Sequence, residues 1–291
     1  MLLSLDAFLR KERALFQRAG VEAPHLCAEL LLAHALGLTR PALLQRAILT
    51  PHSSLSHADL RAYTSLRARR LRGEPVAYIL GQKEFYGRPF KVNAATLIPR
   101  PETELVVETA KQHFAGRRQG VFADFGTGSG CLAVTLALEL GRDWRGLALD
   151  ISPPALAVAA NNAQNLGAAE KLLFILADYA APPLAQASLD LMAANPPYIS
   201  LDEFHKLHPG VRCFEPANAL LAGPQGTEHL LLLAALAVEM LKPGGLLLME
   251  TGYSQGRSLR ATLRPQDWTE TLILRDLAGL DRLLLARRGG G

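Results

Sequence analysis

The sequence predicts an α/β protein in which a mainly parallel, doubly wound sheet with an antiparallel last strand follows a small bundle of helices. Two observations carry this prediction. From about residue 102, short apolar runs alternate with helical patterns, which is typical of a parallel sheet covered by helices on both faces. Residues 4–73, in contrast, place their apolar residues at helical spacing with no strand-like run between them.

Residues 1–73 are predicted to form short helices joined by short turns. Apolar residues recur three and four positions apart, as in Leu5, Phe8 and Leu9, and Gly or Pro residues separate successive sets. This segment holds 11 Lys and Arg against 5 Asp and Glu, whereas residues 74–291 hold 20 against 22. A basic lobe can bind an acidic protein face or nucleic acid, and a solvated helix surface explains the charge equally well. Because no catalytic cluster lies here, we expect a docking domain.

Residues 74–98 are predicted to form a β-hairpin that connects two domains. Aromatic and β-branched residues gather in three runs, at 76–80, 85–86 and 89–92, and Gly81 and Gly87 separate these runs. Such runs split by glycines are typical of strands joined by tight turns.

Residues 99–291 are predicted to form the doubly wound domain. Helical patterns cover 102–114, 130–140, 153–166 and 227–241, and strand-like runs cover 120–125, 146–150, 172–177, 189–194 and 246–250. The last two runs, 269–275 and 282–287, leave no room for a crossover helix, so we expect an antiparallel pair. The ligand crevice of such a sheet lies outside the carboxyl ends of its strands. Five strands end there in a polar residue: Asp124, Asp150, Asp178, Asn195 and Glu250.

A glycine-rich loop follows the first of these strands and opens a helix. It consists of Gly126, Thr127, Gly128, Ser129 and Gly130. Glycines let the backbone turn tightly and approach a ligand closely, and the helix N-terminus offers free N–H groups to a carboxylate or phosphate. Asp150 ends the next strand, where a carboxylate can accept hydrogen bonds from both ribose hydroxyls. A dinucleotide site would use similar residues, but the G-x-G-x-G spacing after Asp124 favours S-adenosylmethionine.

The run Asn195-Pro196-Pro197-Tyr198 follows a buried strand and predicts methylation of a planar nitrogen. Two prolines stiffen the loop and remove two N–H donors, so the Asn195 side-chain oxygen and the Pro196 carbonyl can both accept from one NH2 group. Tyr198 can stack on a flat amide or ring. An amide nitrogen is a poor nucleophile, and two acceptors orient it and stabilise the positive charge that develops on methylation. The alternative is a Pro-Pro loop that merely ends a strand.

Cysteine usage and the apolar pattern predict a cytoplasmic protein without a metal centre or a membrane segment. Cys27, Cys131 and Cys213 lie far apart with no C-x-x-C pair, which argues against a disulfide framework or a zinc site. His205 and His208 have no Cys or carboxylate cluster at ligand spacing. The longest apolar run is far shorter than the roughly 18 residues of a membrane span.

These motifs resemble the HemK/PrmC family of peptide chain release factor N5-glutamine methyltransferases. The likeness runs over nearly the whole chain and is most specific in Leu97-Ile98-Pro99-Arg100-Pro101-Glu102-Thr103-Glu104. It also includes residues 73–81, 85–87, 124–130, 195–199, 214–216 and 276–279. The resemblance implies a class I methyltransferase fold, which is a Rossmann-like doubly wound sheet, preceded by a helical N-terminal domain.

The resemblance also implies an activity, a cofactor and a partner. The family methylates the side-chain amide of the glutamine in the Gly-Gly-Gln motif of class I release factors. The glycine loop and Asp150 would bind S-adenosylmethionine, with Asp178 and Tyr179 beside the adenine, although the family often has Trp or Leu at the latter position. Asn195 would hold the glutamine amide, Pro196, Pro197 and Tyr198 would shape its slot, and residues 1–73 would dock the release factor. We expect a monomer that does not bind nucleic acid directly.

An adenine-N6 nucleic-acid methyltransferase is the main alternative, because such enzymes use a similar loop on a flipped base. The near-neutral charge of residues 74–291 argues against the basic cleft that nucleic acid requires. A non-catalytic binding module and a dinucleotide oxidoreductase fit the motifs less well. Arg100, Glu102 and Glu104 are compatible with a lid over the site and equally with a capped helix start.

Overall fold

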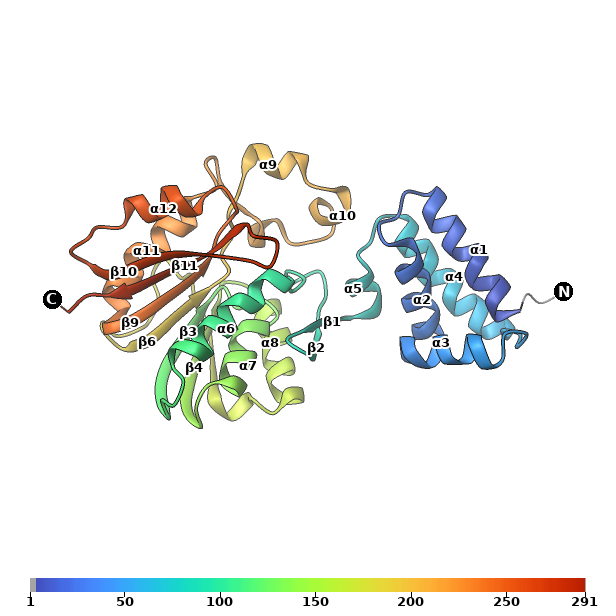
Figure 1. Ribbon diagram of the computed structural model, residues 1–291, viewed down its shortest axis with the longest axis horizontal. Coiled ribbons are helices and arrows are strands. Elements are labelled where there is room, and N and C mark those ends of the chain that lie inside the picture. Colours follow the sequence, from blue (N-terminus) through green and yellow to red (C-terminus); the bar gives the residue numbers. More distant parts are fainter. Residues whose placement is uncertain (1–3, 291) are drawn as a thin grey trace. The chain divides into compact units, whose positions relative to one another are not determined.

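The computed structural model describes residues 4–290 and divides into two compact units, residues 1–81 and 82–291, each of which is considered by itself (Figure 1). The N-terminal unit is entirely helical, as predicted. Its helices are α1 (Leu5–Arg18), α2 (Pro24–Ala35), α3 (Arg40–Leu49), α4 (His57–Leu71) and α5 (Val76–Leu80).

Side-chain caps and an apolar core account for the N-terminal bundle. The hydroxyls of Ser4, Thr39 and Ser56 accept hydrogen bonds from the first turns of α1, α3 and α4, which satisfies backbone donors that the helices cannot. The buried carboxylate of Glu12 accepts from Tyr63 and pairs with Arg67 on α4. The bundle therefore has its own apolar core and its own internal ion pairs, which also include those of Glu29 with Arg13 and Arg40.

The predicted hairpin over residues 74–98 is only partly right, because residues 76–80 form helix α5 instead of a strand. Gly81 adopts the left-handed conformation that ends a helix, and Ile79 is buried in the core of the N-terminal bundle. The hairpin consists of β1 (Gln82–Phe85) and β2 (Arg88–Lys91), with Tyr86 and Gly87 both at positive φ in the turn. Because this hairpin packs on the core of the second unit, the division falls at residue 81 rather than at 73.

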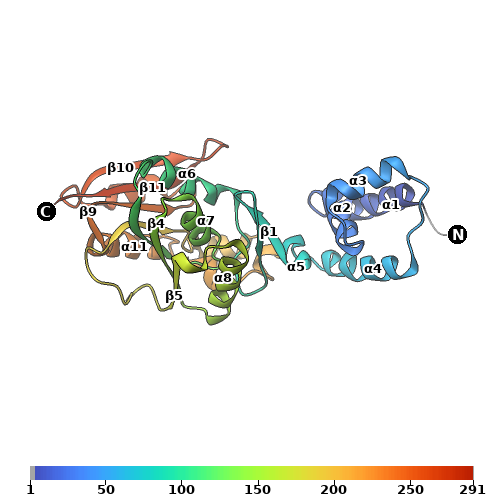
Figure 2. The same cartoon turned by 90° about the horizontal axis from the view of Figure 1, so that it is seen from below.

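The second unit contains a seven-stranded sheet with the strand order β10-β11-β9-β6-β3-β4-β5. Strands β3 to β6 and β9 are parallel, and β11 is antiparallel to both β9 and β10, as predicted. In Figure 2 the red strands β10 and β11 lie at one edge and the yellow β5 at the other. The strands are β3 (Gln119–Phe125), β4 (Asp143–Asp150), β5 (Leu172–Leu176), β6 (Leu189–Ala194), β9 (Leu241–Glu250), β10 (Trp268–Arg275) and β11 (Asp281–Arg288).

Helices cover both faces of this sheet, which confirms the doubly wound architecture. Alternate strand residues point to opposite faces. One core cluster joins the sheet to α6 (Glu104–His113), α7 (Cys131–Glu139) and α8 (Pro153–Leu166), and the other joins it to α11 (Glu228–Met240) and α12 (Gly256–Thr262). The 3-10 turn η2 (Ala169–Lys171) lies at the amino end of β5. Other short elements lie near the carboxyl ends of the strands: η1 (Pro101–Thr103), β7 (Ile199–Ser200), α9 (Leu201–Lys206), α10 (Pro209–Arg212), η3 (Ala217–Ala219) and β8 (Leu221–Gly223).

Within residues 4–290, no single helix is long and apolar enough to cross a membrane. Helices α2 and α3 pass that test of length and composition only as a pair, and the pair bends by 92° at its break.

Candidate active site

The strand order brings the glycine loop and the Asn-Pro-Pro-Tyr loop together. Strands β3 and β6 are parallel neighbours, and Phe125 is in register with Ala194. Gly126 and Asn195 therefore leave the sheet side by side. Asp150 ends β4 on the other side of β3, and Asp178 follows β5 by two residues. The sequence thus correctly predicted that polar residues meet at one edge of the sheet.

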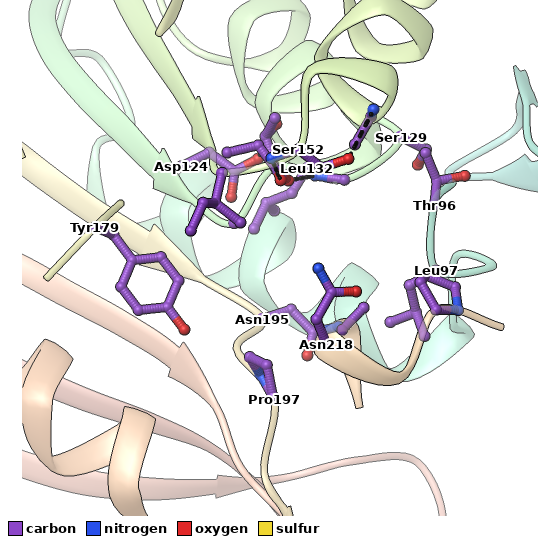
Figure 3. A pocket seen from close by; sticks show the side chains of 18 of the residues that line it. Thr96, Leu97, Asp124, Ser129, Leu132, Ser152, Tyr179, Asn195, Pro197 and Asn218 are labelled. Atoms are coloured by element: carbon purple, nitrogen blue, oxygen red, sulfur yellow. Dashed lines mark hydrogen bonds between the residues drawn. The ribbon is translucent and has the colours of Figure 1, made fainter. Parts of the chain in front are cut away.

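A cavity of about 370 Å³ opens at this edge (Figure 3). Most of the predicted site residues line it: Gly126, Thr127, Gly128, Ser129, Asp150, Asp178, Tyr179, Asn195 and Pro197. Gly130, Pro196 and Tyr198 do not belong to its lining. In the close view the glycine-loop side lies across the cavity from Asn195 and Pro197, with Tyr179 at one end and Leu97 at the other.

Two carboxylates hold the glycine loop in place. The buried Asp124 accepts from the Thr127 hydroxyl at 2.7 Å and from the Ala133 N–H at 3.1 Å. Burial raises the pKa of Asp124 to about 7. Asp150 accepts from the N–H groups of Gly128 at 2.8 Å and Ser152 at 2.9 Å, one on each oxygen. Because a carboxylate oxygen has more than one acceptor direction, Asp150 can still accept from a ligand.

Close packing against α8 explains why residue 130 is a glycine. Its φ is +78°, and an added Cβ would lie 2.9 Å from the Ala159 Cβ on α8. The glycine thus allows α7 and α8 to approach each other directly behind the loop.

Aromatic and aliphatic groups surround the cavity beyond Asp150. Ile151 is 58% exposed although it lines the cavity, so its side chain offers an apolar surface to a ligand. The Tyr179 hydroxyl lies 2.8 Å from His229 Nδ1, which fixes the position of the Tyr179 ring. Burial raises the pKa of Tyr179 above its usual range, so its hydroxyl stays protonated at neutral pH.

The side-chain amide nitrogen of Asn195 donates a hydrogen bond to another residue of the protein. Asn195 Nδ2 donates to Thr103 Oγ1 at 3.0 Å, and the Thr103 hydroxyl donates to Glu250 Oε2 at 2.6 Å. The Tyr198 hydroxyl donates to the other oxygen of Glu250 at 3.1 Å. Glu250 thus holds both Thr103 and Tyr198 next to the Asn-Pro-Pro-Tyr loop. The Asn195 side-chain oxygen and the Pro196 carbonyl accept no hydrogen bond from residues 4–290.

Comparison with known proteins identifies the family. The PrmC N-terminal domain matches residues 7–81, and a methyltransferase domain matches residues 118–271. A release factor glutamine methyltransferase of Nitratidesulfovibrio vulgaris is 47% identical over 289 residues, which cover 98% of this chain and 95% of the relative. The chain belongs to the release factor glutamine methyltransferase family. A relative with the same name from Vibrio cholerae is 37% identical over 99% of this chain and 98% of its own length.

The cofactor of this methyltransferase is S-adenosylmethionine, and the cavity fits it. The volume is within the range of pockets for small ligands, roughly 300–1,000 Å³. Asp150 belongs to a mostly apolar lining that also includes Asp124 and Asp178, which suits a nucleoside. Gly126 and Gly128 bring bare backbone to the cavity, and α7 begins directly behind the glycine loop.

The structure of this methyltransferase shows the contacts of Arg100 and Glu104 and the position of Glu102, which the sequence did not determine. Arg100 Nη2 lies 2.7 Å from Glu215 Oε1, and the second oxygen of Glu215 accepts from the Ile98 N–H at 3.0 Å. Glu104 accepts from the Tyr86 N–H at 2.7 Å and so holds the hairpin turn against α6. Glu102 is exposed in the 3-10 turn that precedes α6.

Sequence reasoning missed several residues around the cavity. Thr103, Leu97 and Asn218 line it, and none of them was assigned a role from the sequence. Thr103 lies 92 positions from Asn195 in the chain, and only its place in the specific segment 97–104 marked it. Because these two residues lie so far apart in the chain, no local sequence pattern predicts their contact.

Proposed function

We propose that this chain transfers the methyl group of S-adenosylmethionine to the side-chain amide nitrogen of the glutamine in the Gly-Gly-Gln motif of class I release factors. The names of its relatives support this acceptor. The observation that carries it is the pair of unoccupied acceptors, the Asn195 side-chain oxygen and the Pro196 carbonyl, beside the cavity that fits the cofactor. Two acceptors on one rigid loop match the two hydrogens of a primary amide.

The protein would contribute orientation and electrostatics. The cofactor supplies an electrophilic methyl group on a sulfonium. Asn195 and Pro196 would hold the amide NH2 so that the nitrogen lone pair points at that methyl group, which supplies the proximity contribution to the rate. The same two oxygens would stabilise the positive charge that develops on the nitrogen. The alkylated nitrogen then becomes acidic enough to lose its proton to water, so no strong base is required before transfer.

The binding of the cofactor follows from the same cavity. Gly126 to Ser129 would lie along the amino-acid part, and Asp150 would accept from the ribose hydroxyls. Asp178 and Tyr179 would border the adenine, with Tyr179 held by His229. Gly130 would act behind the loop through its packing on α8, and Tyr198 would act beneath Asn195 through Glu250.

The N-terminal unit would dock the release factor. It combines a surplus of Lys and Arg with exposed apolar side chains at the end of α3, where Ile48 is 77% and Leu49 is 69% exposed. Such a surface suits a protein partner with an acidic face. We propose a cytoplasmic monomer that does not bind nucleic acid directly, which is in line with the near-neutral charge of residues 74–291.

A methyl-transfer assay tests the acceptor. The full chain is incubated with radiolabelled S-adenosylmethionine and either an intact class I release factor, the same factor with its Gly-Gly-Gln glutamine changed to alanine, or adenine-containing DNA or RNA. We expect label on the intact factor only. Label on the alanine variant would move the site of modification, and label on nucleic acid alone would establish the adenine-N6 alternative instead.

A further inference from the structure

A chain of hydrogen bonds connects the amide of Asn195 to a buried carboxylate on the neighbouring strand. Asn195 follows β6, Glu250 ends β9, and these two strands are parallel neighbours. The Thr103 hydroxyl lies between them, 3.0 Å from Asn195 Nδ2 and 2.6 Å from Glu250 Oε2. Thr103 is 2% exposed and Glu250 is 1% exposed, so water does not compete for these bonds.

The direction of this chain decides which end of the Asn195 amide faces the cavity. A threonine hydroxyl has a single proton, and an ionised carboxylate can only accept. The proton of Thr103 therefore goes to Glu250, which leaves only lone pairs for Asn195. Asn195 must then turn its NH2 group to Thr103 and its oxygen away. The two ends of an amide have nearly the same shape, so hydrogen bonding rather than packing fixes this choice.

We propose that Thr103 and Glu250 are positioning residues, which orient the Asn195 amide so that the slot presents only oxygens to the acceptor. The inference rests on the proposed function, because a slot of two oxygens serves to bind an NH2 group. If the hydrogen bonds from Asn195 through Thr103 to Glu250 ran in the opposite direction, Asn195 would present its own NH2 group to the amide of the acceptor. Donor would then face donor, and the acceptor nitrogen would lose both its orientation and its charge stabilisation.

Glu250 accepts two hydrogen bonds, which favours its ionised form. Its charged and titratable neighbours are Arg282 on β11, Glu102 on η1, the Tyr198 hydroxyl and the Cys131 thiol on α7. Burial is the largest influence and, with Glu102, raises the pKa of Glu250 above its usual range, whereas the two hydrogen bonds and Arg282 limit that rise. A protonated Glu250 would donate to Thr103, which would free the threonine proton for the Asn195 oxygen and so reverse the chain.

Substitutions at Thr103 test the proposal. Thr103→Val keeps the shape of the side chain and removes the hydroxyl, and Thr103→Ser keeps the hydroxyl. The matched control is Thr135→Val on α7, since Thr135 is fully buried and its hydroxyl has no hydrogen-bond partner within residues 4–290. We expect Thr103→Val to lower kcat about 10- to 100-fold with the cofactor Kd within about twofold. Thr103→Ser should restore most of the rate, and Thr135→Val should match the unaltered protein.

Discrimination between glutamine and glutamate separates positioning from a merely structural role. A release factor whose motif is changed to Gly-Gly-Glu offers a carboxylate, which two oxygens repel and an NH2 group attracts. The unaltered enzyme and Thr103→Ser should bind the glutamine form much more tightly than the glutamate form. Thr103→Val should lose a large part of that preference. Full kcat and full preference in Thr103→Val would overturn the proposal, as would a loss that Thr103→Ser does not restore.

The orientation can also be measured without any acceptor. In the 15N-labelled protein, the Asn195 side-chain NH2 should exchange slowly with solvent and respond to Thr103→Val but not to Thr135→Val. This readout keeps the proposal testable if the chain methylates something other than a release factor. A rapidly exchanging NH2 group in the unaltered protein would show that Asn195 does not donate to Thr103, and the inference would fail independently of the proposed function.

The pH dependence of kcat gives a further measurement that does not involve substitution of Thr103. Because the ionised Glu250 holds the productive orientation, kcat should rise with pH through the pKa of Glu250. The glutamine side chain in Glu250→Gln cannot titrate, so the rise of kcat with pH through this pKa should disappear in the variant. If the rise of kcat with pH persisted unchanged in a folded Glu250→Gln protein, another group would be responsible for it, and the role of Glu250 would be contradicted.

Discussion

The carboxylate of Glu215 joins Arg100 to the backbone of Ile98, with one oxygen for each partner. Glu215 is almost fully buried, whereas the Arg100 side chain is about one third exposed. The two segments that it ties together both contribute to the cavity, Leu97 and Pro99 from one and Pro216 and Asn218 from the other. This link therefore shapes the end of the cavity that Leu97 lines, opposite Tyr179.

Breaking this link should impair binding of the acceptor more than binding of the cofactor. Arg100→Met leaves the Glu215 carboxylate buried with only the Ile98 N–H, which should cost about 2 kcal/mol of stability. We expect the KM for the release factor to rise about tenfold, because the segment 97–100 loses one of its two contacts with Glu215. Steady-state kinetics with each substrate varied in turn measures the effect. Arg264→Met, at an exposed ion pair with Asp267, is the control. An equal rise in the cofactor KM would argue against a local effect.

The Asn195 amide should matter for transfer and hardly at all for the cofactor. Asn195→Ala removes one of the two oxygens that hold the acceptor, and removal of one such group typically lowers kcat by about 10²–10³-fold. Calorimetry should give a cofactor Kd within a few-fold of the unaltered value, since the glycine loop and Asp150 remain. Asn165→Ala, on the exposed face of α8, should leave both quantities unchanged. Near-normal transfer by Asn195→Ala would remove Asn195 from the mechanism.

The sequence predicted those site residues that lie in local motifs at strand ends. Asp150 ends one strand-like run and Asn195 follows another, and the rule that ligands bind at the carboxyl ends of parallel strands brings them together. Thr103 and Glu215 could not be assigned in this way. Their partners, Asn195 and Arg100, lie 92 and 115 residues away, so the contacts exist only once the chain has folded.

The error at residues 76–80 has a different cause. A five-residue apolar run does not distinguish a strand from a buried helical turn. Here the burial of Ile79 in the N-terminal core decides for a helix, and Gly81 ends it in the left-handed conformation. Pro75 before the run and Gly81 after it are the usual flanks of a short helix and could have indicated it.

The buried Asp124 should make stability depend on pH. Its pKa is raised to about 7 in the folded protein, so between pH 4 and 7 the folded state holds a proton that the unfolded state has lost. The contribution of Asp124 is therefore complete below about pH 4 and falls by up to about 1.4 kcal/mol per pH unit until about pH 7. Urea unfolding at several pH values, for the unaltered protein and for Asp124→Asn, isolates this contribution as a difference. A difference that does not vary between pH 5 and 7 would mean that Asp124 is ionised in the folded state.

Substitution of Gly130, the third glycine of the loop, should lower the stability of the fold more than the affinity for the cofactor. Gly130 and Gly167 have nearly the same left-handed backbone, with φ of +78° and +76°, but only at Gly130 would an added Cβ meet a neighbour, 2.9 Å away at Ala159. Gly167→Ala should therefore cost about 1 kcal/mol of stability, from backbone strain alone. Gly130→Ala should cost about 1–3 kcal/mol more, because α7 and α8 must separate.

Urea unfolding and cofactor titration of the two alanine variants distinguish packing from ligand contact. The folded fraction of Gly130→Ala should bind the cofactor within a few-fold of the unaltered Kd, since Gly130 does not belong to the cavity lining. If Gly130→Ala were as stable as Gly167→Ala and yet failed to bind the cofactor, Gly130 would contact the ligand directly, as its place in the G-x-G-x-G motif first indicated. The pair of variants thus assigns the last glycine of the motif either to helix packing or to the cofactor.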